Sequence, residues 1–232
     1  MAEIIEEPSF RNRLYVFKDR YHAGELLSQK LREYRRDKDA YILAIPAGGV
    51  QVAVKISENL EIPLDVVVTR KLHIPWNREA GFGALSWNGM TFLNEPLVES
   101  IGLTQEEIDQ CRAEEQKAID RRLRLFRGDR PFPDLNNKTA IIVDDGLASG
   151  FSMLTTLKAL KNTELKEIVV AVPTAPVSAI ELIKPLADRI ICLNIRYGPI
   201  FAVADAYKEW YDLIDDDVIK ILKKHYAHDQ QV

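Results

Sequence analysis

Two adjacent carboxylates, Asp144 and Asp145, follow a short apolar run that ends at Val143. Small residues come next, and the apolar pattern then predicts a helix over about 151–162. A helix N-terminus presents unpaired N–H groups at the positive end of the helix dipole, so it can bind a phosphate. The two carboxylates repel phosphate, and they suit neighbouring hydroxyl groups or a magnesium ion reached through water. The pattern therefore predicts a site for a phosphorylated sugar, whereas the structural alternative is an ordinary loop.

Basic residues follow a neighbouring apolar run. Arg70 and Lys71 come at the end of the run 64–69, and Arg and Lys are the natural partners of a polyanion such as pyrophosphate. Arg78 lies in the segment 72–82, which has no periodicity and reads as a mobile loop that could exclude water. The competing interpretation is that these charges serve solubility alone.

Short apolar strands alternate with amphipathic helices along the chain. We predict strands over 41–45, 64–69, 140–143, 167–172 and 189–194, and helices over 22–36, 50–60, 104–127, 151–162, 177–186 and 216–226. Asn88-Gly89 between two strand-like runs predicts a hairpin, and Thr104 with Glu107 predicts a capping box. The alternation is typical of a parallel α/β sheet, which binds ligands at the carboxyl ends of its strands.

Residues 143–152 resemble the phosphoribosyl-pyrophosphate (PRPP) binding signature of type I phosphoribosyltransferases, with Gly146 where the strict signature has an aliphatic residue or Ser. The run Pro46-Ala47-Gly48-Gly49 looks like the pyrophosphate loop of that family, in which a backbone peptide faces the leaving group. Thr69-Arg70-Lys71 is similar to the segment that follows the next strand in orotate and adenine phosphoribosyltransferases. These parts occur in the family's order, so the resemblance covers about 20–215.

The resemblance implies a fold and an arrangement of domains. We expect one domain over 1–232, with a parallel sheet flanked by helices and a small hood that includes 195–203. A β-hairpin flexible loop over 72–82 and a C-terminal helical tail over about 205–226 complete it.

The resemblance also implies an activity. The chain would be a pentosyltransferase of nucleotide metabolism that transfers 5-phosphoribose between PRPP and a nitrogenous base, with Mg²⁺ on the PRPP. Asp144 and Asp145 would hold the ribose hydroxyls and, through water, the magnesium ion. The other residues that it assigns to catalysis are Arg70, Lys71 and Arg78. The residues that it assigns to PRPP binding are Ala47, Gly48, Gly49, Gly146, Leu147, Ala148, Ser149, Gly150, Phe151 and Ser152.

The acceptor is less well defined by the sequence. Tyr197 and Phe201 could stack on a base, although either could equally belong to the core. In 6-oxopurine enzymes of this family an Asp stands where this chain has Ala148, and orotate and adenine enzymes carry Ala there. We therefore expect poor activity on hypoxanthine and guanine. Regulators reuse the same fold, so a PRPP or nucleotide sensor without catalysis is the alternative.

Composition excludes several other classes. The 232 residues carry a formal net charge of −4, which argues against a nucleic-acid binder. Cys111 and Cys192 are too few for a disulfide framework, and the four His have no zinc-like spacing. The acidic start MAEIIEE lacks the pattern of a secretory signal, and no apolar run approaches the length of a membrane helix. We therefore expect a cytoplasmic protein and, by family resemblance, a homodimer.

Overall fold

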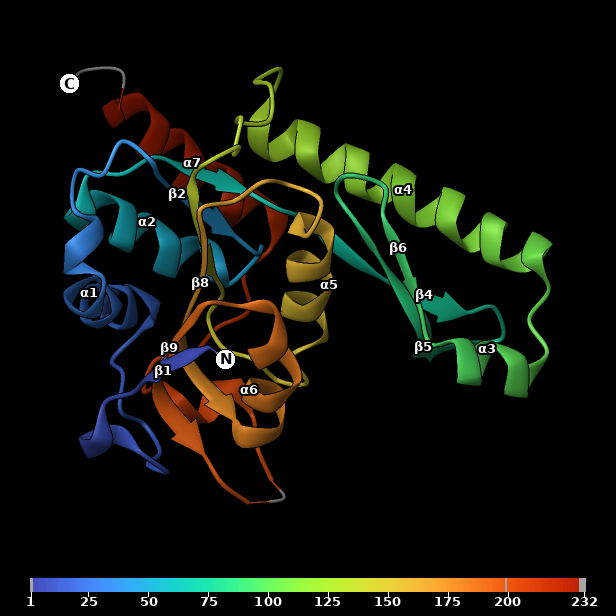
Figure 1. The fold of residues 1–232 in the computed structure, drawn as a ribbon, viewed down its shortest axis with the longest axis horizontal. Helices are drawn as coiled ribbons and strands as arrows, with labels where there is room; N and C mark the ends of the chain where they lie inside the picture. Colours follow the sequence, from blue (N-terminus) through green and yellow to red (C-terminus); the bar gives the residue numbers. More distant parts are fainter. Residues whose placement is uncertain (1, 199, 230–232) are drawn as a thin grey trace.

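The computed structural model describes residues 2–198 and 200–229, without the side chains of 78, 79, 228 and 229. Its centre is a six-stranded sheet in which all neighbouring strands pair in parallel (Figure 1). In spatial order the strands are β1 (Glu3–Ile5), β9 (Arg189–Arg196), β8 (Glu167–Pro176), β7 (Thr139–Val143), β2 (Ala40–Ala44) and β3 (Leu64–Val66). This confirms the predicted parallel α/β class.

Helices cover both faces of this sheet because its central strands are apolar on both sides. Within β7, Ile141 and Val143 join the core on one face, and Ala140 and Ile142 join the core on the other. The first core contains residues of α1 (Arg20–Lys30), α2 (Gly49–Leu60) and α7 (Asp215–Asp229). The second contains residues of α5 (Phe151–Leu160) and α6 (Val177–Ile183). Short 3₁₀ helices are η1 (Pro8–Phe10), η2 (Arg32–Tyr34), η3 (Lys184–Leu186) and η4 (Val203–Ala206).

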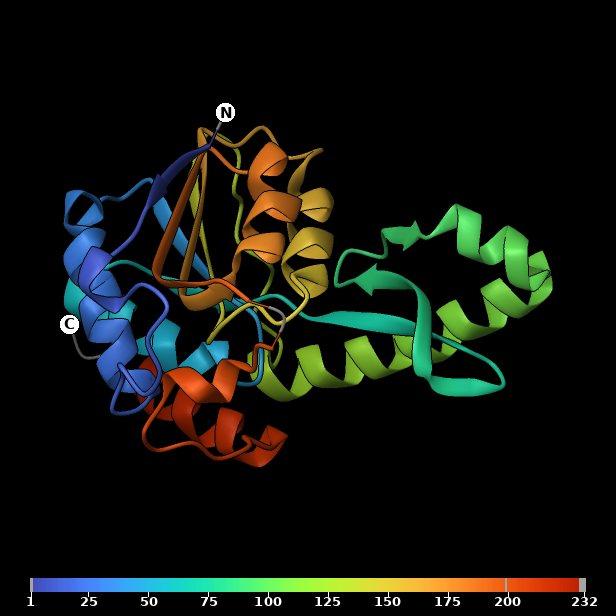
Figure 2. The ribbon, with the colours of Figure 1, turned by 90° about the horizontal axis from the view of Figure 1, so that it is seen from below.

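A second sheet projects from this body as an arm (Figure 2). It is antiparallel and consists of β4 (Thr69–Ile74), β5 (Asn77–Ser86) and β6 (Thr91–Leu93). The helices α3 (Glu95–Ile101) and α4 (Gln105–Arg127) follow it, and α4 runs back along the arm to the body (Figures 1 and 2).

The segment 72–82 is largely strand, in agreement with the expected β-hairpin, although its residues alone show no strand periodicity. Residues on either side of Pro75-Trp76 pair across β4 and β5, with register shifts around His73. Two glycines hide the alternation that would have predicted strands. A Cβ at Gly83 would lie 2.5 Å from the carbonyl oxygen of Phe92, so the close pairing with β6 requires glycine there.

Other local signals were read correctly. Thr104 and Glu107 form the capping box at the start of α4, and Gly89 has the positive φ that its hairpin turn needs. The strand β1 was not predicted, because its acidic sequence gives no apolar run. No helix in the part of the chain that the structure describes combines the length and apolarity needed to cross a lipid bilayer.

Candidate functional site

A cavity of about 520 Å³ opens at the carboxyl ends of β2 and β7. We call it the carboxylate cavity, because Asp144 and Asp145 lie in its wall. Its remaining lining comes from α1, from the loops after β2 and β7, from the start of α5 and from the C-terminal segment. These lining residues are Arg20, Ala47, Gly48, Gly146, Leu147, Ala148, Ser149, Gly150, Phe151, Ser152, Met153, Val203, Trp210, Asp212 and Leu213.

The loop after β2 lies directly against the two carboxylates. The Pro46–Ala47 peptide is cis, and Gly48 follows it. A Cβ at Gly48 would lie 1.8 Å from Oδ2 of Asp145, and a Cβ at Gly49 would lie 2.9 Å from Cα of Asp144. Only glycine permits this approach, so the two loops predicted from separate strand ends meet in one site.

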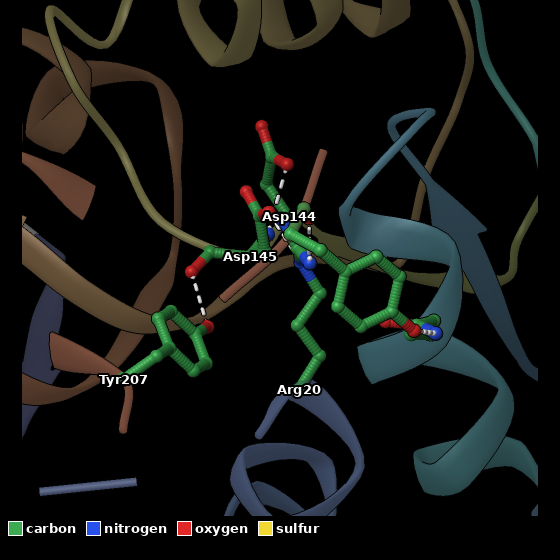
Figure 3. A network of polar contacts seen from close by, with 6 residues as sticks. Arg20, Asp144, Asp145 and Tyr207 are labelled. Carbon is green, nitrogen blue, oxygen red and sulfur yellow. Dashed lines mark hydrogen bonds and ion pairs between the residues drawn. The ribbon is translucent and has the colours of Figure 1, made fainter. Parts of the chain in front are cut away.

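Arg20 holds Asp145 in place (Figure 3). The side chain of Arg20 is buried, and its Nε donates to Oδ2 of Asp145 at 2.7 Å. Its NH1 donates to the carbonyl oxygen of Tyr211 at 2.9 Å, and its guanidinium lies 3.9 Å from the ring centroid of Trp210. Tyr207 donates its hydroxyl to the carbonyl oxygen of Asp145 at 2.6 Å. One arginine therefore joins α1, the loop after β7 and the C-terminal segment.

The two carboxyls have unusual electrostatics. Burial raises the pKa of Asp144 well above its usual range, and the negative charge of Asp145 raises it further. Burial also raises the pKa of Asp145, while the adjacent Arg20 guanidinium opposes that shift. Burial thus opposes the ionised form of both carboxyls, and Arg20 is the cation that lies at hydrogen-bond distance from the pair among the described residues. A ligand that brings a cation or hydrogen-bond donors to this point would favour the ionised form of the pair.

The loop 148–152 leads from the carboxylates into α5. Gly150 adopts φ +78°, a left-handed conformation that favours glycine, and it stands at the N-cap of α5 without a side-chain cap. The backbone N–H groups at the start of α5 thus adjoin a cavity, next to the hydroxyls of Ser149 and Ser152. Leu147 instead contributes its side chain to the core, and a Cβ at Gly146 would collide with Val203.

The predicted basic residues lie to one side of the carboxylate cavity. Arg70 and Lys71, on β4, line a neighbouring cavity, and Arg70 forms an ion pair with Glu115 at 2.7 Å. The side chain of Arg78 lies outside the described residues. Tyr197 is exposed and Phe201 is half-buried, and neither is among the residues that line the carboxylate cavity. Their predicted contact with a base stays a prediction.

Sequence reasoning missed Arg20, Tyr207 and Trp210. Arg20 is 125 residues from Asp145 in the chain, and nothing in its local sequence signals a partner. Trp210 lies in an irregular segment, where an aromatic residue can belong either to a core or to a ligand site. No cluster of three metal-ligating side chains occurs among the described residues.

The fold is that of a type I phosphoribosyltransferase. Residues 18–206 match the family model described as "Phosphoribosyl transferase domain", and the chain belongs to this family. Two curated relatives, from Mycobacterium tuberculosis strains H37Rv and CDC 1551, are each named "Putative phosphoribosyl transferase". Each is 32% identical over 209 residues, which are 90% of this chain and 47% of the relative. This chain thus spans about half the length of these relatives.

A solved structure is also similar. The crystal structure of TT1426 from Thermus thermophilus superposes with a TM-score of 0.75 at 31% identity. The match covers 90% of this chain and 98% of that one. The agreement extends over nearly the whole of that structure and confirms the fold class.

Proposed function

We propose that this chain transfers 5-phosphoribose from PRPP to a nitrogenous base and releases pyrophosphate. The observation that carries the proposal is that one cavity joins Asp144 and Asp145 to the loop 148–152 and to the peptide before Gly48. In this proposal the carboxylates bind the ribose diol, the loop binds the 5-phosphate and the peptide faces the pyrophosphate, all within one cavity. Family membership supports the same reaction class.

In this proposal the protein positions the reactants and stabilises the leaving group. The bond from C1 of the ribose to pyrophosphate breaks, a bond from C1 to a ring nitrogen forms, and the proton of that nitrogen is released. Asp144 and Asp145 hold the ribose hydroxyls, and Ser149 with the first turn of α5 binds the 5-phosphate. Backbone groups at Ala47 and Gly48 face the pyrophosphate, where stabilisation of developing charge lowers the barrier.

The residues fit a magnesium ion bound mainly by the substrate. Mg²⁺ in phosphate sites keeps several waters and uses one or two protein carboxylates, which is what this pair can offer. A cation beside Asp144 and Asp145 would favour their ionised form, which burial opposes. When bound, the ion would neutralise charge on the pyrophosphate. The chain's own task is to keep the carboxylates in place, which Arg20 and Gly48 do.

A regulator that binds PRPP without catalysis is the second candidate, and one observation favours it. The guanidinium of Arg70, assigned to the pyrophosphate, is already paired with Glu115. In that case the leaving group would lack one of its expected partners.

Pyrophosphate release with Mg²⁺ separates the two candidates. We expect release with at least one of adenine, orotate and uracil, and little with hypoxanthine or guanine, because the methyl group of Ala148 cannot exchange a proton with the base. General acid–base assistance is worth about 10²–10⁴ in rate, so its absence is measurable. A preference for hypoxanthine or guanine would contradict the assignment of Ala148. PRPP binding without release on any base would establish the regulator.

A further inference from the structure

A second cavity, of about 530 Å³, lies between α5 and the three-stranded sheet of the arm. Figures 1 and 2 both show α5 facing that sheet. We call it the lysine cavity. Its lining residues are Thr69, Arg70, Lys71, Gly81, Phe82, Gly83, Ala84, Phe92, Leu93, Asn94, Ser149, Phe151, Ser152, Leu154, Thr155 and Lys158. Its volume is within the range of about 300–1,000 Å³ that small-molecule sites occupy.

The charge of this lining is of one sign. Among the lining residues that the structure describes, three are cationic and none is acidic, although the whole chain has a net charge of −4. Glu115 compensates Arg70 from outside the lining. Lys158 forms no ion pair with any carboxylate whose side chain the structure describes, and its Nζ lies 5.4 Å from the ring centroid of Phe92. A cavity of this kind attracts anions.

The position of Lys71 is set by its neighbours. A Cβ at Gly81 would lie 2.4 Å from Cδ of Lys71, so the lysine stem lies across the bare backbone of β5. Any side chain at Gly81 would displace that stem. The close contact with Gly81 therefore fixes the position of the Lys71 stem in the cavity wall.

The rest of the wall combines uncharged polar residues with apolar ones. Phe92, Leu93 and Leu154 are half-buried, and Phe151 is 61% exposed although it is a large aromatic side chain. Ser149, Phe151 and Ser152 line both this cavity and the carboxylate cavity. The two sites are thus adjacent and separated by the start of α5.

We infer that the lysine cavity binds a second ligand, an organic anion on a flat aromatic body. The anionic group would meet Lys158, and the ring would lie against Phe92 and Phe151. The inference can be tested apart from the proposed transfer reaction, because Lys158 has no role in that proposal, although Ser149, Phe151 and Ser152 line both cavities.

The test is calorimetric titration of the whole protein with 2-naphthoate as the probe. We expect saturable binding, and binding at least about tenfold weaker for 2-naphthylmethanol, which keeps the rings and lacks the charge. Lys158→Met keeps the stem and removes the cation, so it should weaken 2-naphthoate binding about tenfold, the typical worth of one charge-assisted contact. Lys161→Met is the matched control, because Lys161 is an exposed lysine at the end of the same helix and lines neither cavity.

Several outcomes would overturn the inference. They are equal affinity of wild type and Lys158→Met, equal binding of the neutral alcohol, and no binding of 2-naphthoate at millimolar concentration. Loss of 2-naphthoate binding in Asp144→Asn with full binding in Lys158→Met would place the probe in the carboxylate cavity and would also overturn it. Normal 2-naphthoate binding in a protein that releases no pyrophosphate would support this inference while refuting the proposed function.

Discussion

Asp144 and Asp145 are neighbours in sequence, but their side chains have different partners. Asp145 is paired with the buried Arg20, whereas Asp144 accepts from the backbone N–H of Asp145 and has no cationic partner at hydrogen-bond distance among the described residues. A change at Asp145 therefore removes the partner of a buried charge, and a change at Asp144 does not. Substitutions at the two positions can therefore distinguish an effect on ligand binding from an effect on the free energy of unfolding.

We predict opposite stability effects for the two amide variants. Asp145→Asn should lower the free energy of unfolding by about 3 kcal/mol or more, because it leaves the Arg20 guanidinium buried and unpaired. Asp144→Asn should keep or increase it at pH 7, because burial already opposes the ionised form. Urea unfolding measures both. Equal destabilisation by the two substitutions would contradict this account of the pair.

The raised pKa of Asp144 also predicts how stability depends on pH. A carboxyl whose pKa is higher in the folded state than in the unfolded state, near the ordinary 3.8, stabilises the fold fully only below 3.8. That stabilisation is lost as the pH rises through the folded-state pKa. Wild type should therefore lose stability relative to Asp144→Asn as the pH rises from about 4. Exposed carboxyls with lowered pKa values, such as Glu61, act in the opposite direction in both proteins and cancel in the difference.

Urea unfolding of the two proteins at several pH values from 4 to 8 provides the comparison. A stability difference that does not change over this range would show that Asp144 titrates normally. A shift in the other direction, with wild type gaining stability relative to Asp144→Asn as the pH rises, would show that its pKa is lowered, contrary to the effect of burial.

At the scale of elements, the sequence predicted those strands and helices whose signals lie in adjacent residues. The apolar runs of β2 and β7 and the capping box of α4 were recognisable because each depends on a few adjacent residues. The Asp pair, the small-residue loop and the helix after it were recognised for the same reason. Arg20 and Trp210 were not, because they belong to the site only through contacts between distant segments. In the antiparallel sheet, the runs on either side of Asn88-Gly89 were recognised, whereas β4 and the first half of β5 were not, and Gly81 and Gly83 interrupt the alternation of β5.

The hairpin of β4 and β5 carries a prediction about closure. Its turn contains Trp76, which is 63% exposed, while Leu72 and Phe82 on the paired strands are buried. Limited chymotrypsin digestion should therefore cut at Trp76 and spare the paired strands. If the hairpin closes over PRPP, then PRPP with Mg²⁺ should slow that cut, whereas cleavage at the exposed Tyr15, which lines neither cavity, serves as the internal reference. Equal rates at Trp76 with and without ligand would indicate a static hairpin.

At the scale of the whole molecule, the carboxylate cavity lies where separate parts of the chain converge. Its wall takes residues from α1, from the loops after β2 and β7, from α5 and from the C-terminal segment. Tyr207 and Phe17 form a bridge that brings the C-terminal segment back to the residues before α1. A ligand in this cavity would therefore contact parts that must all be folded at once, and it should stabilise the native state as a unit.

We accordingly predict that PRPP with Mg²⁺ raises the unfolding midpoint in a concentration-dependent way. A ligand at 100 times its Kd adds about 2.7 kcal/mol to the free energy of unfolding, which for a chain of this size is a rise of about 5–10 °C. Asp144→Asn should abolish the rise while remaining folded, because it removes the carboxylate that is proposed to hold the ribose hydroxyls and, through water, the magnesium ion. Pyrophosphate with Mg²⁺ is the control, because it carries the anionic groups without the ribose that Asp144 is proposed to hold. An equal rise with pyrophosphate alone, or an undiminished rise in Asp144→Asn, would show that the cavity binds anions without recognising the sugar.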